Sequence, residues 1–438
     1  MNGGRRGGDH PGVRADAAAP MPLTPIERPA RQMLSIVAVA VVLQAVAWAY
    51  LAWLLRSGGP WYGFFDVSDI VVYLDYAQKV AAGQAVYRDF AFEYPPLALP
   101  LFTLPYRGDP AAYPTWFAAE MILLGTAAAA LTGATAAAIW RGLWRPLAAG
   151  GAFALAVLAA GAITANRYDV AVALTLAACL FFLARRLPAA AGAALGVGVA
   201  LKLTPGLLLP LVLMVAETRR RALLAFIGFL VFAAVPFLPF LGRLDGLTGV
   251  VTYHAQRPLQ IESVPGTPYL IAGAAGAWGV GTGTSFGSQS LAGPGSELVG
   301  RASVWVGLLL VAGVYVLVWR RRASLRAAPE RVPVAALACV LAFTVANKVL
   351  SPQFLCWTFP LVALVVVGRG ALQRITGILT LVAIALTQVE FPYLYWRMVD
   401  LEPGPVAVVA ARNAVLVGAA ALAAVTVWRL PRDAGADG

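Results

Sequence analysis

The chain has 438 residues, of which 60% are hydrophobic and only 12% are charged. Soluble domains carry about 25% charged residues, so this composition excludes a soluble globular protein and predicts an all-α protein that crosses a lipid bilayer many times. The net charge of +12 does not require a nucleic acid, because the basic residues gather in short segments between apolar stretches, as in cytoplasmic loops. The three cysteines lie singly in apolar segments, which argues against disulfides and a zinc site.

The N-terminal segment, residues 1–31, is rich in Gly, Pro, Ala and Arg and lacks apolar periodicity. It is predicted to be a disordered cytoplasmic tail. The apolar stretch at residues 33–55 is long enough to span a bilayer, so we interpret it as a first transmembrane helix and not as a signal peptide. Arg28 and Arg31 before it favour a cytoplasmic N-terminus.

The first outer loop, residues 57–110, begins with a predicted amphipathic helix. Apolar residues recur at helical spacing over residues 67–81, and Gly83 is a plausible stop. Asp69 and Tyr73 share one face of this helix. The structural explanation is that Asp66 is the N-cap and that Asp69 favours the helix dipole, and both are also candidates for chemistry.

The second part of this loop mixes charged and aromatic side chains over residues 87–94. An aromatic belt at the membrane surface explains the rings, but it does not explain three charges among them. Arg88, Asp89, Glu93 and Tyr94 are therefore candidate substrate contacts.

Eleven further apolar stretches follow, and with the first helix they predict about 11–13 passes. Alternation of these passes leaves most Lys and Arg residues on the side of the two termini, which places both termini in the cytoplasm of a bacterial cell and residues 431–438 in a second cytoplasmic tail. The stretches lie at residues 111–140, 146–165, 170–184, 189–201, 205–216, 222–241, 299–319, 332–346, 354–368, 376–390 and 406–428.

Two lysines stand out because only three of the 33 basic residues are lysine. Lys202 and Lys348 each end an apolar run, and a hydroxyl residue followed by proline comes soon after each. An ammonium, a hydroxyl and a loosened helix end suit a phosphate, whereas snorkelling to the interface is the alternative. The short stretches around Lys202 are either half-helices or one Pro-broken helix, and flanking basic clusters favour two short passes.

The second outer loop, residues 242–298, contains the other candidates. His254 has a structural or solvated role as its simplest explanation, whereas Arg257 suits bidentate binding of a phosphate. Glu262 suits either an ion pair with Arg257 or a hydrogen bond from a sugar hydroxyl. The Gly-, Ser- and Thr-rich stretch at residues 281–295 predicts a flexible end to this loop.

Motifs for cofactors are missing from the sequence. It holds no P-loop, no dinucleotide fingerprint, no Ser-His-Asp spacing and no metal-ligand cluster. We therefore expect no cofactor and no metal, with a cation shared by Asp66 and Asp69 as the remaining alternative.

Six stretches together resemble glycosyltransferase family 87, membrane enzymes of the GT-C superfamily related to mycobacterial mannosyltransferases that use polyprenol-phosphate mannose. They occur in order from residue 66 to residue 396, and the first and fifth are the most specific. The stretches are DVSDIVVYLDYAQKVAAGQAVYRDFAFEYPPLALP (66–100), NRYD (166–169), ALKLTPGLLLP (200–210), QRPLQIESV (256–264), NKVLSPQFLCWTFPL (347–361) and QVEFPYLYW (388–396).

The resemblance implies a GT-C bundle over residues 32–430 and a catalytic base in the first outer loop. Asp69 matches that position, with Asp66 in reserve. The implied donor is a polyprenyl-phosphate sugar, mannose by family default with arabinose open, and the acceptor is a lipid or glycan outside the plasma membrane. The donor-phosphate candidates are then Lys202, Lys348, Arg257 and His254, and the substrate candidates are Tyr73, Arg88, Asp89, Glu93, Tyr94, Glu262 and Gln353.

Two other classes of function compete with this one. A secondary transporter fits the broken helices and the charges in apolar segments, but the acidic residues fall in outer loops and not at the bilayer midplane. A lipid flippase or polymer ligase would use similar phosphate contacts without a base, so activity that survives Asp69→Asn would favour it.

Overall fold

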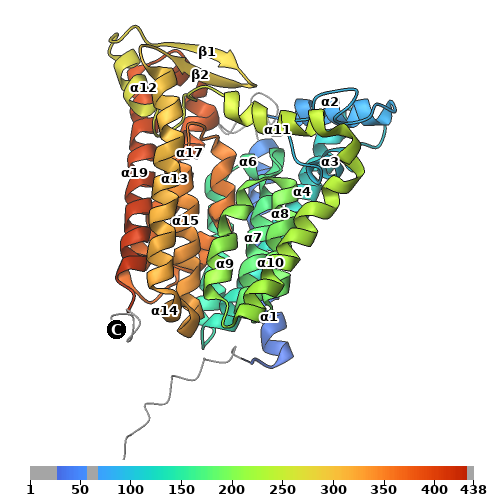
Figure 1. Cartoon of the computed structure of the whole chain (residues 1–438), viewed down its shortest axis with the longest axis vertical. Helices are drawn as coiled ribbons and strands as arrows, with labels where there is room; N and C mark the ends of the chain where they lie inside the picture. The colour runs from blue at the N-terminus through green and yellow to red at the C-terminus, as the bar shows by residue number, and fades with distance from the viewer. Residues whose placement is uncertain (1–26, 57–67, 432–438) are drawn as a thin grey trace, which may run out of the picture.

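The computed structural model describes residues 27–56 and 68–431 of the chain. The predicted tails lie mostly outside these residues, and Asp66 lies outside them as well. Within the described residues the fold is an all-α bundle capped at one end by short helices and a two-stranded hairpin (Figure 1). The predicted all-α polytopic architecture is therefore confirmed.

Each predicted apolar stretch forms one or two helices of the bundle. In the described residues, seven helices are long and apolar enough to cross a membrane, and five shorter apolar helices accompany them. The bundle helices are α1 (Ala30–Arg56), α4 (Tyr113–Ile139), α5 (Trp144–Ala160), α7 (Asp169–Ala184), α8 (Pro188–Leu201), α9 (Leu209–Val215), α10 (Arg219–Ala234), α13 (Ser296–Arg320), α15 (Val332–Ala346), α16 (Phe359–Val366), α17 (Ala371–Gln388) and α19 (Pro403–Trp428).

Short helical segments connect these bundle helices. Among them, α2, α11 and α12 lie at the capping end with the hairpin, whereas α14 lies at the opposite end, near the two termini of the described chain (Figure 1). The short segments are α2 (Ile70–Ala81), α3 (Ala98–Thr103), α6 (Ile163–Asn166), η1 (Thr204–Leu208), η2 (Val235–Arg243), α11 (Leu244–Gln256), α12 (Thr267–Ala274), α14 (Arg322–Ala327), η3 (Pro329–Arg331), η4 (Pro352–Thr358), η5 (Val389–Leu394) and α18 (Tyr395–Val399).

The amphipathic helix predicted in the first outer loop is α2, which lies across the end of the bundle (Figure 1). Its N-cap position falls on Asp69 and not on Asp66, and the Asp69 side chain makes no capping hydrogen bond. The Asp69 side chain therefore does not cap the helix, which is the role that the sequence suggested for Asp66. Gly83 follows the helix with a φ of 82°, the left-handed conformation that commonly ends helices.

The chain around Lys202 enters the bundle and returns, as two short passes. Helix α8 ends at Leu201, Lys202 is extended, and η1 with α9 leads back. At the far ends of these two passes, the Arg186 side chain pairs with Glu217 at 2.6 Å. The break therefore places Lys202 inside the protein at the turn between the passes.

The Gly-rich stretch that was predicted to be flexible is a β-hairpin instead. Strands β1 (Gly281–Ser285) and β2 (Ser288–Ala292) pair antiparallel, and the Phe286-Gly287 turn has positive φ at both residues, 48° and 63°. Two such residues fit the tight turn that matches strand twist. Strand β2 also bonds the segment before Glu262, since Leu291 N donates to Leu259 O at 2.9 Å. The Gly-, Ser- and Thr-rich composition suggested flexibility because composition does not reveal which segments pair as strands.

Helices α8 and α10 pack closely through glycine. A Cβ atom added at Gly192 of α8 would overlap the backbone carbonyl of Ala225 in α10. Small residues allow this close approach of membrane helices. We expect Gly192→Ala to lower the free energy of unfolding by about 1–3 kcal/mol because the helices must separate. Thermal unfolding of the detergent-solubilised protein measures the effect. Gly151→Ala in α5, where a Cβ meets nothing within 4 Å, is the control, and equal stability of the two variants would contradict the prediction.

Candidate active site

A cavity of about 550 Å³ lies at the end of the bundle that carries α2, α11 and the hairpin. Both outer loops and the break at Lys202 contribute to its walls, so segments far apart in the sequence meet there. Eight of the predicted site residues line it: Asp69, Glu93, Tyr94, Lys202, His254, Arg257, Glu262 and Gln353.

Asp69 presents its carboxylate to this cavity from the start of α2. The side chain is 32% exposed, and Oδ2 lies 3.0 Å from Nε of Arg167, which is 6% exposed. The Tyr73 hydroxyl donates to the same oxygen at 3.4 Å, and its ring stacks on Phe102 with centroids 4.1 Å apart. Asp69 is therefore held in one place at the cavity wall, as a general base must be.

Lys202 forms a buried ion pair at the cavity wall. Its Nζ lies 2.6 Å from Oδ1 of Asp169, and the indole Nε1 of Trp357 donates to the same oxygen at 2.6 Å. The rings of Tyr168 and Phe354 each lie 4.9 Å from the ammonium. An ion pair inside the protein, and not snorkelling to the interface, accounts for the position of this lysine.

Arg257 keeps donor capacity for a ligand. It follows α11, and its Nη2 donates to the Ser288 hydroxyl of the hairpin at 2.8 Å. Its Nε is buried and has no hydrogen-bond partner among the described residues. The predicted alternative that Glu262 pairs with Arg257 is wrong, because Glu262 accepts from the amide of Gln260 at 2.8 Å. The remaining guanidinium donors suit an anion such as a phosphate.

His254 is a neutral member of the cavity wall. The residue as a whole is exposed, but the partial burial of its ring at the cavity wall, followed by the positive charges of Arg257 and Lys202, lowers its pKa. The imidazole is therefore uncharged at pH 7. The sequence suggested His254 as a ligand of the donor phosphate. A neutral imidazole can donate a hydrogen bond to that phosphate but adds no positive charge.

Several predicted site residues do not line the cavity. The Lys348 ammonium donates to the backbone oxygen of Ala255 at 2.7 Å on an exposed surface. Arg88 pairs with its neighbour Asp89 at 2.8 Å, and Asp89 also accepts from Ala85 N at 2.7 Å. Arg88 and Asp89 stabilise a local turn, whereas Lys348 links two segments that lie 93 residues apart in the chain. The carboxylate of Asp89 has a lowered pKa because of its bonds to Arg88 and to the Ala85 backbone.

The structure adds site residues that had no predicted role. Arg167 and Asp169 lie in the NRYD stretch, and each pairs with a predicted site residue. The available signal was the occurrence of opposite charges between two apolar runs, which marks functional positions in membrane proteins. Within residues 27–56 and 68–431, no group of three or more His, Cys, Asp or Glu side chains is placed to hold a metal ion. A cation shared with Asp66 falls outside these residues.

The fold and the cavity define an integral membrane protein in which a carboxylate and cationic groups face one cavity at one end of the bundle. The chain belongs to glycosyltransferase family 87, whose sequence profile matches residues 92–352. It is therefore a membrane glycosyltransferase.

The solved structures that resemble this chain include two crystal structures of ArnT from Cupriavidus metallidurans. The one bound to undecaprenyl phosphate is 16% identical with a TM-score of 0.44, covering 91% of this chain and 77% of ArnT. The apo structure gives the same identity and TM-score, covering 88% and 78%. Likenesses this distant say nothing of what the present chain binds. Among curated proteins, none matches the chain.

Proposed function

We propose that the protein transfers a sugar, mannose in the first instance, from a polyprenyl-phosphate donor to a hydroxyl of a lipid or glycan acceptor. The observation that carries this proposal is a single cavity in which the Asp69 carboxylate lies together with the Arg257 guanidinium and the Lys202 ammonium. In a glycosyltransferase, these groups supply a base for the acceptor and cations for a phosphate leaving group.

The chemistry is a single displacement with inversion. Asp69 takes the proton of the acceptor hydroxyl while that oxygen forms a bond to the anomeric carbon. The bond from the anomeric carbon to the phosphate oxygen breaks, and its electron pair leaves with the polyprenyl phosphate. The proton remains on Asp69 and then passes to water. No covalent intermediate with the protein is needed.

Arg257 and Lys202 stabilise the negative charge of the leaving phosphate. A phosphate leaves readily without protonation, so fixed positive charge stabilises it better than an acid would. Arg257 has buried donor capacity left, and neutral His254 adds a hydrogen bond. Lys202 is partly neutralised by Asp169, so Arg257 carries the larger share of this role.

We extend the proposal to the path of the lipid tail and to the orientation of the protein in the membrane. The cavity lining becomes apolar at Leu203, Leu207 and Phe343, which suits a prenyl chain entering between η1 and α15.

Arginine-rich segments at residues 219–221 and 320–322 flank the bundle helices, and the positive-inside rule favours a cytoplasmic position for the end that bears the termini. The cavity would then open on the outer side of the plasma membrane.

Arg257→Gln is expected to raise the donor KM about 10- to 100-fold, because a hydrogen bond to a charged group is lost. Transfer from radiolabelled polyprenyl-phosphate mannose, measured in membranes over a range of donor concentrations, gives this value. Arg88→Gln is the matched control, since Arg88 pairs with Asp89 away from the cavity. An unchanged KM in Arg257→Gln would remove this arginine from the phosphate site.

A further inference from the structure

The Phe286-Gly287 turn of the β-hairpin, with Ser288 after it, forms part of the cavity wall. The backbone oxygen of Phe286 accepts a hydrogen bond from the Tyr253 hydroxyl of α11 at 2.7 Å. The rings of these two residues lie edge to face, with centroids 5.4 Å apart. The turn is therefore fixed against α11, the helix that Arg257 directly follows.

The strands of the hairpin are fixed to the rest of the protein as well. The Thr282 hydroxyl of β1 donates to the backbone oxygen of Val399 in α18 at 3.0 Å. In β2, the backbone oxygen of Gln289 accepts from Ile261 N at 3.2 Å. The hairpin is thus bonded to α11, to α18 and to the segment at residues 259–261, so its turn has a defined position at the cavity.

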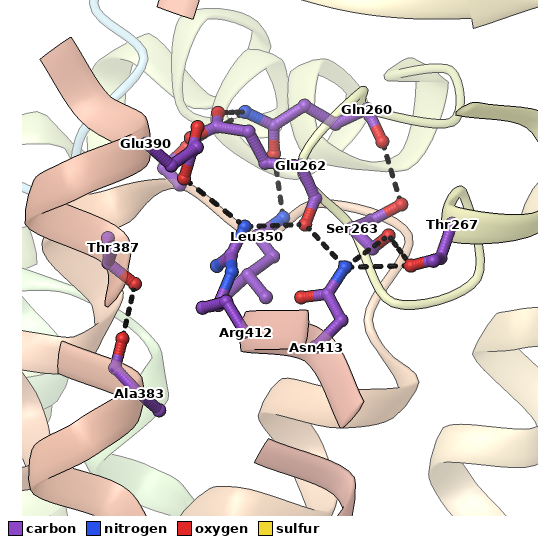
Figure 2. Close-up of polar contacts among 11 residues, drawn as sticks. Gln260, Glu262, Ser263, Thr267, Leu350, Ala383, Thr387, Glu390, Arg412 and Asn413 are labelled. Atoms are coloured by element: carbon purple, nitrogen blue, oxygen red, sulfur yellow. Dashed lines mark hydrogen bonds and ion pairs between the residues drawn. The ribbon is translucent and has the colours of Figure 1, made fainter. Parts of the chain in front are cut away.

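The backbone that follows Arg257 is also held by segments other than the hairpin (Figure 2). The side-chain oxygen of Gln260 accepts from Leu350 N at 2.6 Å. Nη2 of Arg412, in α19, donates to the backbone oxygen of Glu262 at 3.0 Å. These bonds fix the main chain, but the long side chain of Arg257 needs contacts of its own to adopt one conformation.

Ser288 supplies such a contact to the guanidinium of Arg257. Nη2 of Arg257 donates to the Ser288 hydroxyl at 2.8 Å, and this hydroxyl donates in turn to the backbone oxygen of Ser285 at 3.4 Å. The hydroxyl therefore accepts from the cation and donates to the turn, so both of its hydrogen bonds have compatible polarity. The hairpin thereby sets the direction of the guanidinium at the cavity wall.

We infer that Ser288 is a positioning residue of the donor-phosphate site, and that it holds the Arg257 guanidinium in the orientation that binds the phosphate. This inference rests on the proposed function and makes the hairpin turn a part of the phosphate site. A guanidinium that is already oriented loses less conformational entropy when it binds its ligand. Ser288 therefore strengthens donor binding through Arg257.

The first test is the donor dependence of transfer from radiolabelled polyprenyl-phosphate mannose in membranes. Ser288→Ala is expected to raise the donor KM about 3- to 10-fold, the effect of one lost hydrogen bond, and to change kcat by a smaller factor. Ser288→Thr keeps the hydroxyl and suits a strand, so we expect its KM to stay near the wild-type value. A purely structural role of Ser288 would lower the amount of active protein and leave KM unchanged, which would overturn the inference.

Inhibition by the product gives a second readout of the same site. Free polyprenyl phosphate carries the phosphate but no sugar, and it is expected to compete with the donor. Its inhibition constant should rise in Ser288→Ala by the same factor as the donor KM. Neither constant depends on the amount of protein, so lower expression of the variant does not obscure the result. An unchanged inhibition constant would contradict the role of Ser288 at the phosphate.

Ser290→Ala is the matched control within the hairpin. Ser290 lies in the same strand, and its hydroxyl donates to the backbone oxygen of Gly283 at 2.9 Å. It does not belong to the cavity lining among the described residues. We expect a wild-type donor KM in Ser290→Ala. A KM raised as much as in Ser288→Ala would assign the effect to the stability of the hairpin and would overturn the inference.

A double substitution tests whether Ser288 acts through Arg257. In the Arg257→Gln background, Ser288→Ala is expected to raise the donor KM less than about twofold further, because the group that it positions is already gone. If Arg257→Gln alone raises KM but the two effects multiply in full, the positioning role is overturned and the proposed function stands. If the wild type transfers no sugar from any polyprenyl-phosphate donor, both are overturned.

Discussion

Asp69→Asn is expected to lower kcat about 10²- to 10⁴-fold, the range that a positioned general base contributes. The amide keeps the shape of the carboxylate but cannot take the acceptor proton. The amide oxygen can still accept a hydrogen bond from Tyr73, but Arg167 loses its charged partner at 3.0 Å, so folded protein is quantified for each variant. Initial rates of sugar transfer at saturating donor, at equal protein level in membranes, measure the effect.

The control for this prediction lies on the same helix. Asp75 of α2 pairs with Lys79 at 2.6 Å on the exposed surface, so Asp75→Asn is expected to transfer at the wild-type rate. Wild-type rates in Asp69→Asn would contradict the assignment of the base and would transfer the role to Asp66. Loss of activity in both variants would indicate a general requirement for acidic charge on α2.

Asp169→Asn is expected to destabilise the protein by about 3–5 kcal/mol, because it leaves a buried charge without its partner. Lys202 would lose its counterion at 2.6 Å. The indole N–H of Trp357 would lose a charged acceptor. Thermal unfolding of the detergent-solubilised protein would show the loss as a lower midpoint.

A double substitution separates stability from function. Asp169→Asn with Lys202→Met removes both charges, and replacing a buried ion pair by uncharged groups is often neutral. We expect this variant to recover most of the lost stability while transfer stays impaired, since Lys202 also serves the phosphate. A double variant as unstable as the single one would show that the ion pair is not what the single substitution disrupts.

The sequence was sufficient to predict the helices of the bundle. Length and apolar composition determine a membrane helix almost by themselves, because every backbone group must be bonded within the segment. The periodicity over residues 67–81 likewise predicted α2. The hairpin at Gly281–Ser285 and Ser288–Ala292 was missed because its stability comes from pairing with the segment at residues 259–261, which composition does not reveal.

The site was only partly predictable. Charges in outer loops were found readily, but their partners are set by the fold. Arg88 and Asp89 form an ion pair between neighbours in the sequence. In contrast, Asp169 accepts a hydrogen bond from Trp357, which lies 188 residues away in the sequence. Arg412 was overlooked inside the apolar stretch at residues 406–428, although a charge at that depth is itself a signal of function. Sequence therefore located the loops that form the cavity but not the contacts within it.

The most direct test of the account is sugar transfer by the wild-type protein in liposomes from radiolabelled polyprenyl-phosphate mannose, with the products separated and the anomeric configuration determined. We expect label to appear in a lipid or glycan acceptor with the configuration inverted, and polyprenyl phosphate to be released in equal amount. Transfer with retained configuration would contradict the single displacement at Asp69. Transfer from a nucleotide sugar, but from no lipid-linked sugar, would contradict the donor class.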